Sequence, residues 1–177
     1  MPEGLGGELA ARGLTVVDDT CVMVRTQMPT TTAPALPARL RLVMLVRAAF
    51  AEAVGALRGS PAGQLAAHAE RLAQSPVRYQ GWALQDESDG RLLACGQFAI
   101  EAELVGLYDV HTRDNERGRG LASSLCRQIL ALAARQGARV AYLQVEGDNH
   151  DARHIYDRLG FTDAATYHYH ALPVSTA

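Results

Sequence analysis

The sequence predicts an α/β (α+β) fold, in which helices flank a mixed and mostly antiparallel sheet. Apolar residues make up 48% of the 177 residues, which is enough to build one sizeable core. Three strand patterns follow one another closely between residues 78 and 111, as in an antiparallel meander. A strand, a helix and a second strand then span residues 104–145. This order is the minimal right-handed crossover, so we expect its two strands to be parallel.

The first 38 residues differ in character from the rest. Residues 7–24 read as a short helix, a stop at Gly13 and a strand, and a threonine- and proline-rich segment without periodicity follows. We therefore expect residues 1–38 to form a helix–strand extension with a linker, and residues 39–177 to form the main domain.

The next part of the chain alternates between strand and helix patterns. Ser60 suits the N-cap of a helix, and Pro61 suits its first position. The polar segment before Gly90 reads as a hairpin turn. We expect strands at 39–44, 78–84, 91–100 and 104–111, and helices at 46–57 and 60–74.

Residues 113–161 carry the strongest functional signal. The turn Arg117-Gly118-Arg119-Gly120 leads directly into an amphipathic helix over 121–136, which Gly137 ends. The unpaired N–H groups of a first helical turn and the helix dipole attract anions, and arginine side chains add to this attraction. The turn therefore predicts a site for a phosphorylated cofactor.

The remaining elements complete this unit. A strand over 140–145 is followed by a second helix that ends at Leu159-Gly160-Phe161, and residues 161–172 hold one or two further strands. The segment Gly13-Leu14-Thr15 with its following strand parallels Gly160-Phe161-Thr162, so the N-terminal extension reads either as the tail of a degenerate repeat or as a generic helix–glycine–strand unit.

Composition excludes several classes of function. A net charge of −2 and a pI of about 6.3 give no basic footprint for nucleic acid. No run approaches the roughly 18 apolar residues of a membrane span, and the N-terminus lacks a signal core, so we expect a cytoplasmic protein. The three cysteines form no metal pattern, and His168 and His170 lack a third ligand, so we expect no metal.

Two motifs resemble the GNAT superfamily of acyl-coenzyme-A-dependent N-acyltransferases. Its cofactor motif is an Arg or Gln, any two residues, a Gly, any residue, and then a Gly or Ala. This motif is met by Arg117-Gly118-Arg119-Gly120-Leu121-Ala122. Its downstream signature is met by Asn149, Ala152, Tyr156, Gly160 and Phe161. The two motifs lie about 30 residues apart with the expected strand between them, and together they are specific.

The resemblance implies that the two parallel strands splay apart and that acetyl-CoA (coenzyme A) is the cosubstrate. The pantetheine arm would lie in the splay along the strand from Tyr108 to His111, like an added strand. A glycine at position 120 would let the backbone approach the pyrophosphate closely. The cofactor-binding residues that it implies are Tyr108, Val110, Arg117, Gly118, Arg119, Gly120, Leu121, Ala122 and Asn149.

The resemblance also implies a general acid, Tyr156, which would protonate the departing thiolate. The general base is less defined, because Gln144 stands where one branch of the family has a glutamate. Glu146 points to the same face as Gln144 in a regular strand and is the preferred base. Asp109 and His111 are alternatives, and a water relay or an already neutral amine needs no base.

The expected function is transfer of an acetyl group to a primary amine, in a small molecule or a peptide, within a ternary complex. A second reading is a catalytically silent acyl-CoA-binding module, favoured by Gln144. A third, a dinucleotide-binding domain, fails because Ser123 stands where the third glycine belongs. Tyr167 and Tyr169 are candidates for lining the acceptor pocket, and the fold class permits a homodimer.

Overall fold

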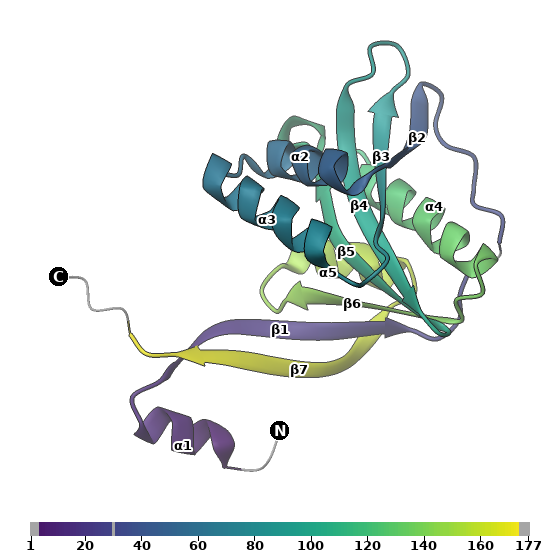
Figure 1. The fold of residues 1–177 in the computed structure, drawn as a ribbon. Coiled ribbons are helices and arrows are strands. Elements are labelled where there is room, and N and C mark those ends of the chain that lie inside the picture. Colours follow the sequence, from purple (N-terminus) through teal and green to yellow (C-terminus); the bar gives the residue numbers. More distant parts are fainter. Residues whose placement is uncertain (1–3, 30, 174–177) are drawn as a thin grey trace.

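The structure, a computed structural model, describes residues 4–29 and 31–173 (Figure 1). Its α-helices are α1 (Leu5–Ala11), α2 (Arg47–Arg58), α3 (Ala62–Gln74), α4 (Leu121–Arg135) and α5 (His150–Arg158). A short 3-10 helix, Asp114–Glu116, precedes α4. The strands are β1 (Thr15–Arg25), β2 (Leu40–Leu45), β3 (Gln80–Asp86), β4 (Leu92–Glu101), β5 (Leu104–Thr112), β6 (Val140–Glu146) and β7 (Thr162–Ala171).

The strands form one seven-stranded sheet in the order β2-β3-β4-β5-β6-β1-β7. Strands β2 to β5 are antiparallel neighbours, which confirms the predicted meander. The β5–β6 pair is parallel, as the strand–helix–strand order predicted. The mixed, mostly antiparallel sheet flanked by helices is therefore confirmed.

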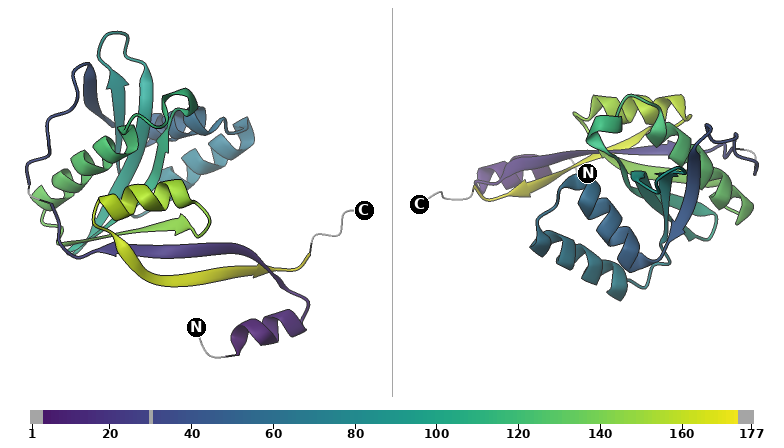
Figure 2. Two further views of the ribbon diagram at one scale, coloured as in Figure 1. Left: turned by 180° about the vertical axis from the view of Figure 1, so that it is seen from behind. Right: turned by 90° about the horizontal axis from the view of Figure 1, so that it is seen from above.

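Helices cover both faces of the sheet and bury two apolar clusters (Figure 2). The larger cluster lies under α4 and α5, and its fully buried members include Phe98, Leu125 and Ile129. The smaller cluster lies under α2 and α3 around Phe50 and Val54. Helices α2 and α4 thus place buried apolar stripes against the sheet, where burial of a large side chain contributes about 1.5–3 kcal/mol. Helix α3 packs mainly on α2 and buries Leu72.

Strand β1 lies inside the sheet, between β6 and β7. It pairs antiparallel with β6 from Thr20↔Glu146 to Arg25↔Ala141, and antiparallel with β7 along its whole length. In Figure 1, β1 and β7 run side by side as a long ribbon that carries α1 at its outer end. The N-terminal strand is therefore part of the main sheet.

One local expectation needs correction. The N-cap of α3 is Pro61 and not Ser60, and no side chain caps this helix. Pro61 has φ −58° and no N–H, so it can stand directly before the first helical turn without leaving a backbone donor unpaired. Of the one or two strands expected over residues 161–172, the structure has one, the continuous strand β7, and both of its halves pair with β1.

Within the described part of the chain, no helix is both long enough and apolar enough to cross a bilayer. All three cysteines are free and buried.

Candidate active site

The site is built where the two parallel strands stop pairing. Strands β5 and β6 are paired only from Leu104↔Val140 to Leu107↔Leu143, although both continue beyond these residues. We call the unpaired ends, residues 108–112 of β5 and 144–146 of β6, the splay. Figure 1 shows the two strands diverging there.

A β-bulge in β5 lies at the same place. The β4–β5 register shifts by one residue between Cys95↔His111 and Gln97↔Tyr108, so Asp109 and Val110 together lie opposite the single residue Gly96. Asp109 has φ +52°, a conformation that aspartate tolerates better than most residues. The bulge shifts the outer half of β5 by one residue against β4, which regular strand alternation did not predict.

The glycine turn begins α4 with free backbone donors. Gly118 and Gly120 have φ +75° and +74°, and Gly120 is the N-cap without a side-chain hydrogen bond. The first N–H of this helix to find a helical acceptor is that of Ser124, which donates to the Gly120 carbonyl. No protein atom lies within 4 Å of a Cβ built on either glycine. The turn therefore offers open space, N–H groups and a positive helix end to an anion.

The two arginines of this turn already have carboxylate partners. Arg117 lies 2.8 Å from Asp114, and Arg119 contacts Glu116. Both guanidinium groups are largely exposed, at 63% and 68%. They lie beside the turn as predicted, but the described structure holds them against acidic residues of the same loop.

Glu116 is a site residue that the sequence reasoning missed. Its carboxylate is buried, and it accepts hydrogen bonds from Arg91 at 2.8 Å and from Arg119. The hydrogen bond from Arg91 lowers the pKa of Glu116 below its usual range. Glu116 thus joins the start of β4 to the glycine turn. The charge pattern of the loop did not predict that this carboxylate is buried. The i,i+3 spacing of Glu116 and Arg119 could have predicted their ion pair.

Tyr156 lies on α5, on the face of the sheet that α4 and α5 cover. Its ring contacts Phe161 at 5.9 Å between centroids. The hydroxyl makes no hydrogen bond to the described residues. Burial, and to a smaller extent the nearby Cys126 thiol group, raises the pKa of Tyr156, so its phenol stays protonated at neutral pH. This combination suits a proton donor.

Asn149 begins α5 as predicted. It is the N-cap, and its side-chain oxygen accepts a hydrogen bond from the Ala152 N–H at 3.1 Å. This cap fixes the start of the helix that carries Tyr156, and a cap of this kind contributes about 1 kcal/mol.

Asp109 faces α2 and α3, on the side of the sheet opposite α5. Arg58 forms an ion pair with it at 2.7 Å, Gln97 donates a hydrogen bond at 2.7 Å, and His68 lies 3.5 Å away. Its two oxygens are therefore engaged by three side chains from α2, β4 and α3. These contacts hold the carboxylate in place on the α2–α3 side of the sheet.

His111 is the other candidate on β5. Burial lowers its pKa, and the charges of Arg58 and Arg117 lower it further. The imidazole is therefore neutral at pH 7, and a neutral imidazole can accept a proton.

Glu146 and Gln144 lie at the β6 side of the splay, and both are exposed. Alternation places them on the face of Tyr142, whose hydroxyl meets that of Tyr108. Tyr108 contacts Tyr79 in the α2–α3 layer, so Glu146 faces the same side as Asp109. The two carboxylates flank the splay from opposite strands, while Tyr156 lies on the other face of the sheet.

The C-terminal tyrosines lie next to the β6 edge of the splay. Tyr167 pairs with Thr20 of β1, and Thr20 pairs on its other side with Glu146 of β6, so one strand separates Tyr167 from the splay. The ring centroids of Tyr167 and Tyr169 are 5.4 Å apart. His168 lies 3.4 Å from Asp19. Within residues 4–29 and 31–173, no three acidic, histidine or cysteine side chains are grouped as metal ligands.

A larger cavity lies away from the splay. It has a volume of about 420 Å³ and is lined by α4, the end of α5, Arg25 at one wall, and Pro29, Thr32, Ala33 and Pro34. Arg25 pairs with Ala141, at the end of β6 that is still joined to β5. This cavity therefore does not adjoin the residues described above.

Comparison with known proteins agrees with this geometry. The profile of the Acetyltransferase (GNAT) family matches residues 56–161. A mycothiol acetyltransferase from Beutenbergia cavernae is 31% identical over 93 residues, which cover 52% of this chain and 31% of that protein. The chain thus spans about a third of that curated relative.

Two solved structures share the fold. A GCN5-related N-acetyltransferase from Sphaerobacter thermophilus has a TM-score of 0.73 at 22% identity, over 93% of this chain and 54% of that one. A tandem GNAT protein from the clavulanic acid biosynthesis pathway also has a TM-score of 0.73, at 15% identity, over 96% and 58%. The family profile covers more than half of the sequence, and the fold and the glycine turn agree with it. The chain belongs to the Acetyltransferase (GNAT) family.

Proposed function

We propose that this protein transfers an acetyl group from acetyl-CoA to a primary amine by direct attack in a ternary complex. The observation that carries the proposal is the position of the splay beside the free N-terminus of α4. Among the described residues, the facing edges of β5 and β6 are unpaired in the splay, and the first N–H groups of α4 have no helical acceptor. As part of the proposal the protein works in the cytoplasm, where its free, buried cysteines would stay reduced.

The chain offers two kinds of contact to coenzyme A. The N–H groups from Gly118 to Ala122 would bind the pyrophosphate, and the open space above the two glycines fits this role. The backbone of Tyr108 and Val110 would bind the pantetheine arm along the splay. Arg117 and Arg119 would turn from their carboxylate partners towards the phosphates, and Asn149 would border the arm.

Tyr156 would supply the proton that the departing thiolate needs. Its raised pKa keeps the phenol protonated, and its hydroxyl has no other partner among the described residues. The acetyl carbon would lie in the splay, between Tyr156 on one face and the acceptor amine on the other. The amine would lose its proton to Glu146, to neutral His111, to Asp109 or to water.

A second candidate is a catalytically silent acyl-CoA-binding module. Two observations favour it. Gln144 cannot take a proton, and Asp109 is held by Arg58, Gln97 and His68. The free Tyr156 hydroxyl favours the enzyme instead.

Release of thiol from acetyl-CoA, measured with a panel of primary amines, separates the two candidates. Amine-dependent release supports the transferase, with calorimetric binding of acetyl-CoA measured in parallel. Binding without release favours the module. Absence of both would contradict the cofactor assignment itself.

A further inference from the structure

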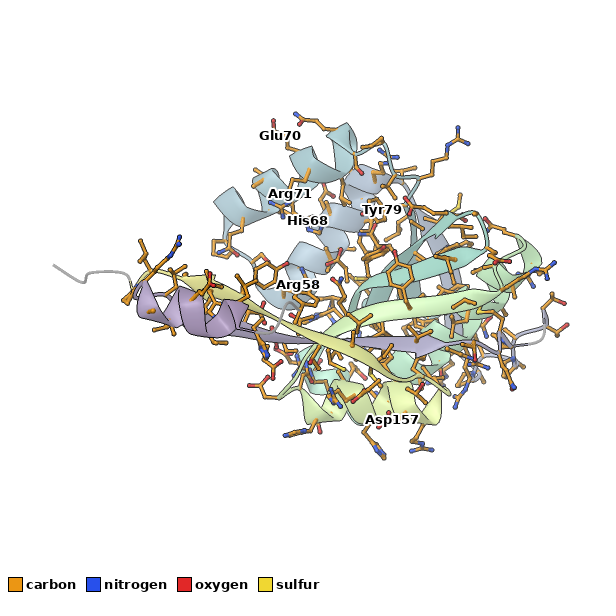
Figure 3. All side chains as sticks on the ribbon, turned by 90° about the horizontal axis from the view of Figure 1, so that it is seen from below. Arg58, His68, Glu70, Arg71, Tyr79 and Asp157 are labelled. Carbon is orange, nitrogen blue, oxygen red and sulfur yellow. The ribbon has the colours of Figure 1, made fainter. Side chains whose placement is uncertain are left out.

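A second, smaller pocket lies between α2 and α3, next to the splay. It has a volume of about 100 Å³ and is lined by Gly55, Arg58, Ser60, Gln64, Leu65, His68 and Arg71. Figure 3 shows Arg58, His68 and Arg71 together on this side of the sheet. Five of the seven lining side chains can donate hydrogen bonds, and none is acidic.

The pocket is formed by the spacing of α3 against α2. Gln64, His68 and Arg71 are separated by four and three residues, so they lie on one face of α3. Glu70, which accepts a hydrogen bond from Gln74, lies on the outer side of the helix in Figure 3. The helices approach closely at Gly55, where an added Cβ would lie 2.6 Å from Leu65. The donors therefore converge without a carboxylate among them.

The charge of this pocket is only partly balanced. Arg58 and His68 both meet Asp109, at 2.7 and 3.5 Å. The Arg71 side chain forms no hydrogen bond or ion pair with the described residues. The pocket thus keeps one guanidinium group that can bind a further anion, and an Arg–carboxylate pair can be bidentate.

Asp109 connects this pocket to the proposed reaction site. It belongs to the bulge of β5, between Tyr108 and Val110, and its carboxylate reaches the pocket wall through Arg58 and His68. A ligand with a negative group near Arg71 could therefore place a positive ammonium group near Asp109 and the splay. That arrangement matches a bipolar molecule.

We propose that the pocket between α2 and α3 binds the carboxylate of the acceptor, and that the acceptor is an amino acid-like primary amine. The inference rests on the proposed acetyl transfer. Arg71 binds the carboxylate, and the amine points past Asp109, whose oxygens Arg58, Gln97 and His68 already engage, towards the splay. The volume corresponds to about three water molecules, which fits the three heavy atoms of a carboxylate group.

The test uses acceptors in matched pairs. Glycine, β-alanine and 4-aminobutyrate are each compared with their amides, which have nearly the same size but lack the negative charge, and the three pairs span three spacings between amine and carboxylate. Thiol release from acetyl-CoA gives kcat and KM, and calorimetry in the presence of coenzyme A gives acceptor binding. We expect at least one carboxylate to exceed its amide about tenfold in kcat/KM, mainly through KM, because hydrogen bonds to charged groups contribute about 1.5–3 kcal/mol.

Two variants identify the residue responsible. Arg71→Gln should bring kcat/KM for the carboxylate down to that of the amide. Arg78→Gln removes an exposed arginine just after α3 that does not line the pocket, and should leave the preference unchanged. If carboxylates and amides bind and react equally, or if Arg71→Gln keeps the preference, the pocket assignment is wrong.

The design also separates this inference from the proposed function. If no amine releases thiol but carboxylates bind better than amides in an Arg71-dependent manner, the pocket stands and acetyl transfer does not. If neither release nor a binding difference is seen, both are contradicted.

Discussion

The hydroxyl of Tyr108 on β5 lies 2.7 Å from the hydroxyl of Tyr142 on β6. Tyr108 directly follows Leu107, and Tyr142 directly precedes Leu143, the last backbone pair between these strands. Their hydrogen bond therefore ties the parallel strands together at the point where they separate. Burial raises the pKa of Tyr108, so this phenol remains a hydrogen-bond donor at neutral pH. The start of the splay is thus fixed by side chains as well as by the bulge.

Replacement of Tyr156 by phenylalanine should lower turnover and leave cofactor binding unchanged. A positioned general acid typically contributes about 10²–10⁴-fold to the rate, and the ring packing on Phe161 is preserved in the variant. The measurement is kcat for thiol release together with the dissociation constant of acetyl-CoA. An unchanged kcat in Tyr156→Phe would remove this residue from the mechanism.

Replacement of Gly120 by leucine should abolish coenzyme A binding, and the same change at Gly137 should not. Both glycines belong to α4, one at each end, with φ +74° and +97°. Each substitution therefore places a side chain in the left-handed region, which costs roughly 1–2 kcal/mol. Only the Gly120 variant also fills the open space beside the glycine turn, where the pyrophosphate is proposed to bind. Calorimetry measures affinity, and urea unfolding measures the shared loss of stability; equal affinities in the two variants would refute the pyrophosphate assignment.

Replacement of Glu116 by glutamine should lower the melting temperature and weaken coenzyme A binding. The neutral amide cannot balance Arg91 and Arg119, so the glycine turn loses its tie to β4. Asp114→Asn is the matched control, because Asp114 pairs with Arg117 on the surface with a side chain 79% exposed. If the two variants behave alike, Glu116 does not organise the turn.

Much of the fold and the conformation of the glycine turn could be predicted from the sequence, because local patterns determine them. The period of α4, the glycines at its two ends and the Asn149 cap depend on neighbouring residues only. The bulge at Asp109 could not be predicted in this way, because it depends on register against Gln97 and on partners from α2 and α3. The same holds for the burial of Glu116, whose partner Arg91 is distant in sequence.

The choice of a general base shows the same division. Strand alternation correctly placed Glu146 and Gln144 on one face, and the sequence also suggested Asp109 and His111. Which of these is free to accept a proton depends on long-range contacts. Arg58 lies 51 residues from Asp109 and engages its carboxylate, while burial leaves His111 neutral. The role of each candidate base stays a prediction.

His111 should make the protein less stable at mildly acidic pH. Its folded-state pKa lies below the ordinary value of 6.5, mainly because of burial. The unfolded chain therefore binds more protons, and the free energy of unfolding falls as the pH drops from about 6.5 towards the lowered pKa. Urea unfolding between pH 7.5 and 5.5 should show a smaller loss in His111→Gln than in the unchanged protein. Parallel curves for the two proteins would contradict this expectation.

The place of β1 between β6 and β7 has a consequence for the order in which the protein folds. Strand β1 hydrogen-bonds only to strands from the other end of the described sequence, and β7 pairs only with β1. Closing so long a stretch of chain is slow, so the local β3–β4–β5 hairpins and α4 should form first. The ribbon of β1 and β7 would then assemble last and cooperatively, and neither strand would gain protection from solvent before the other. Pulse-labelling hydrogen exchange during refolding would show Cys21 and Tyr167 amides becoming protected together, after those of Phe98.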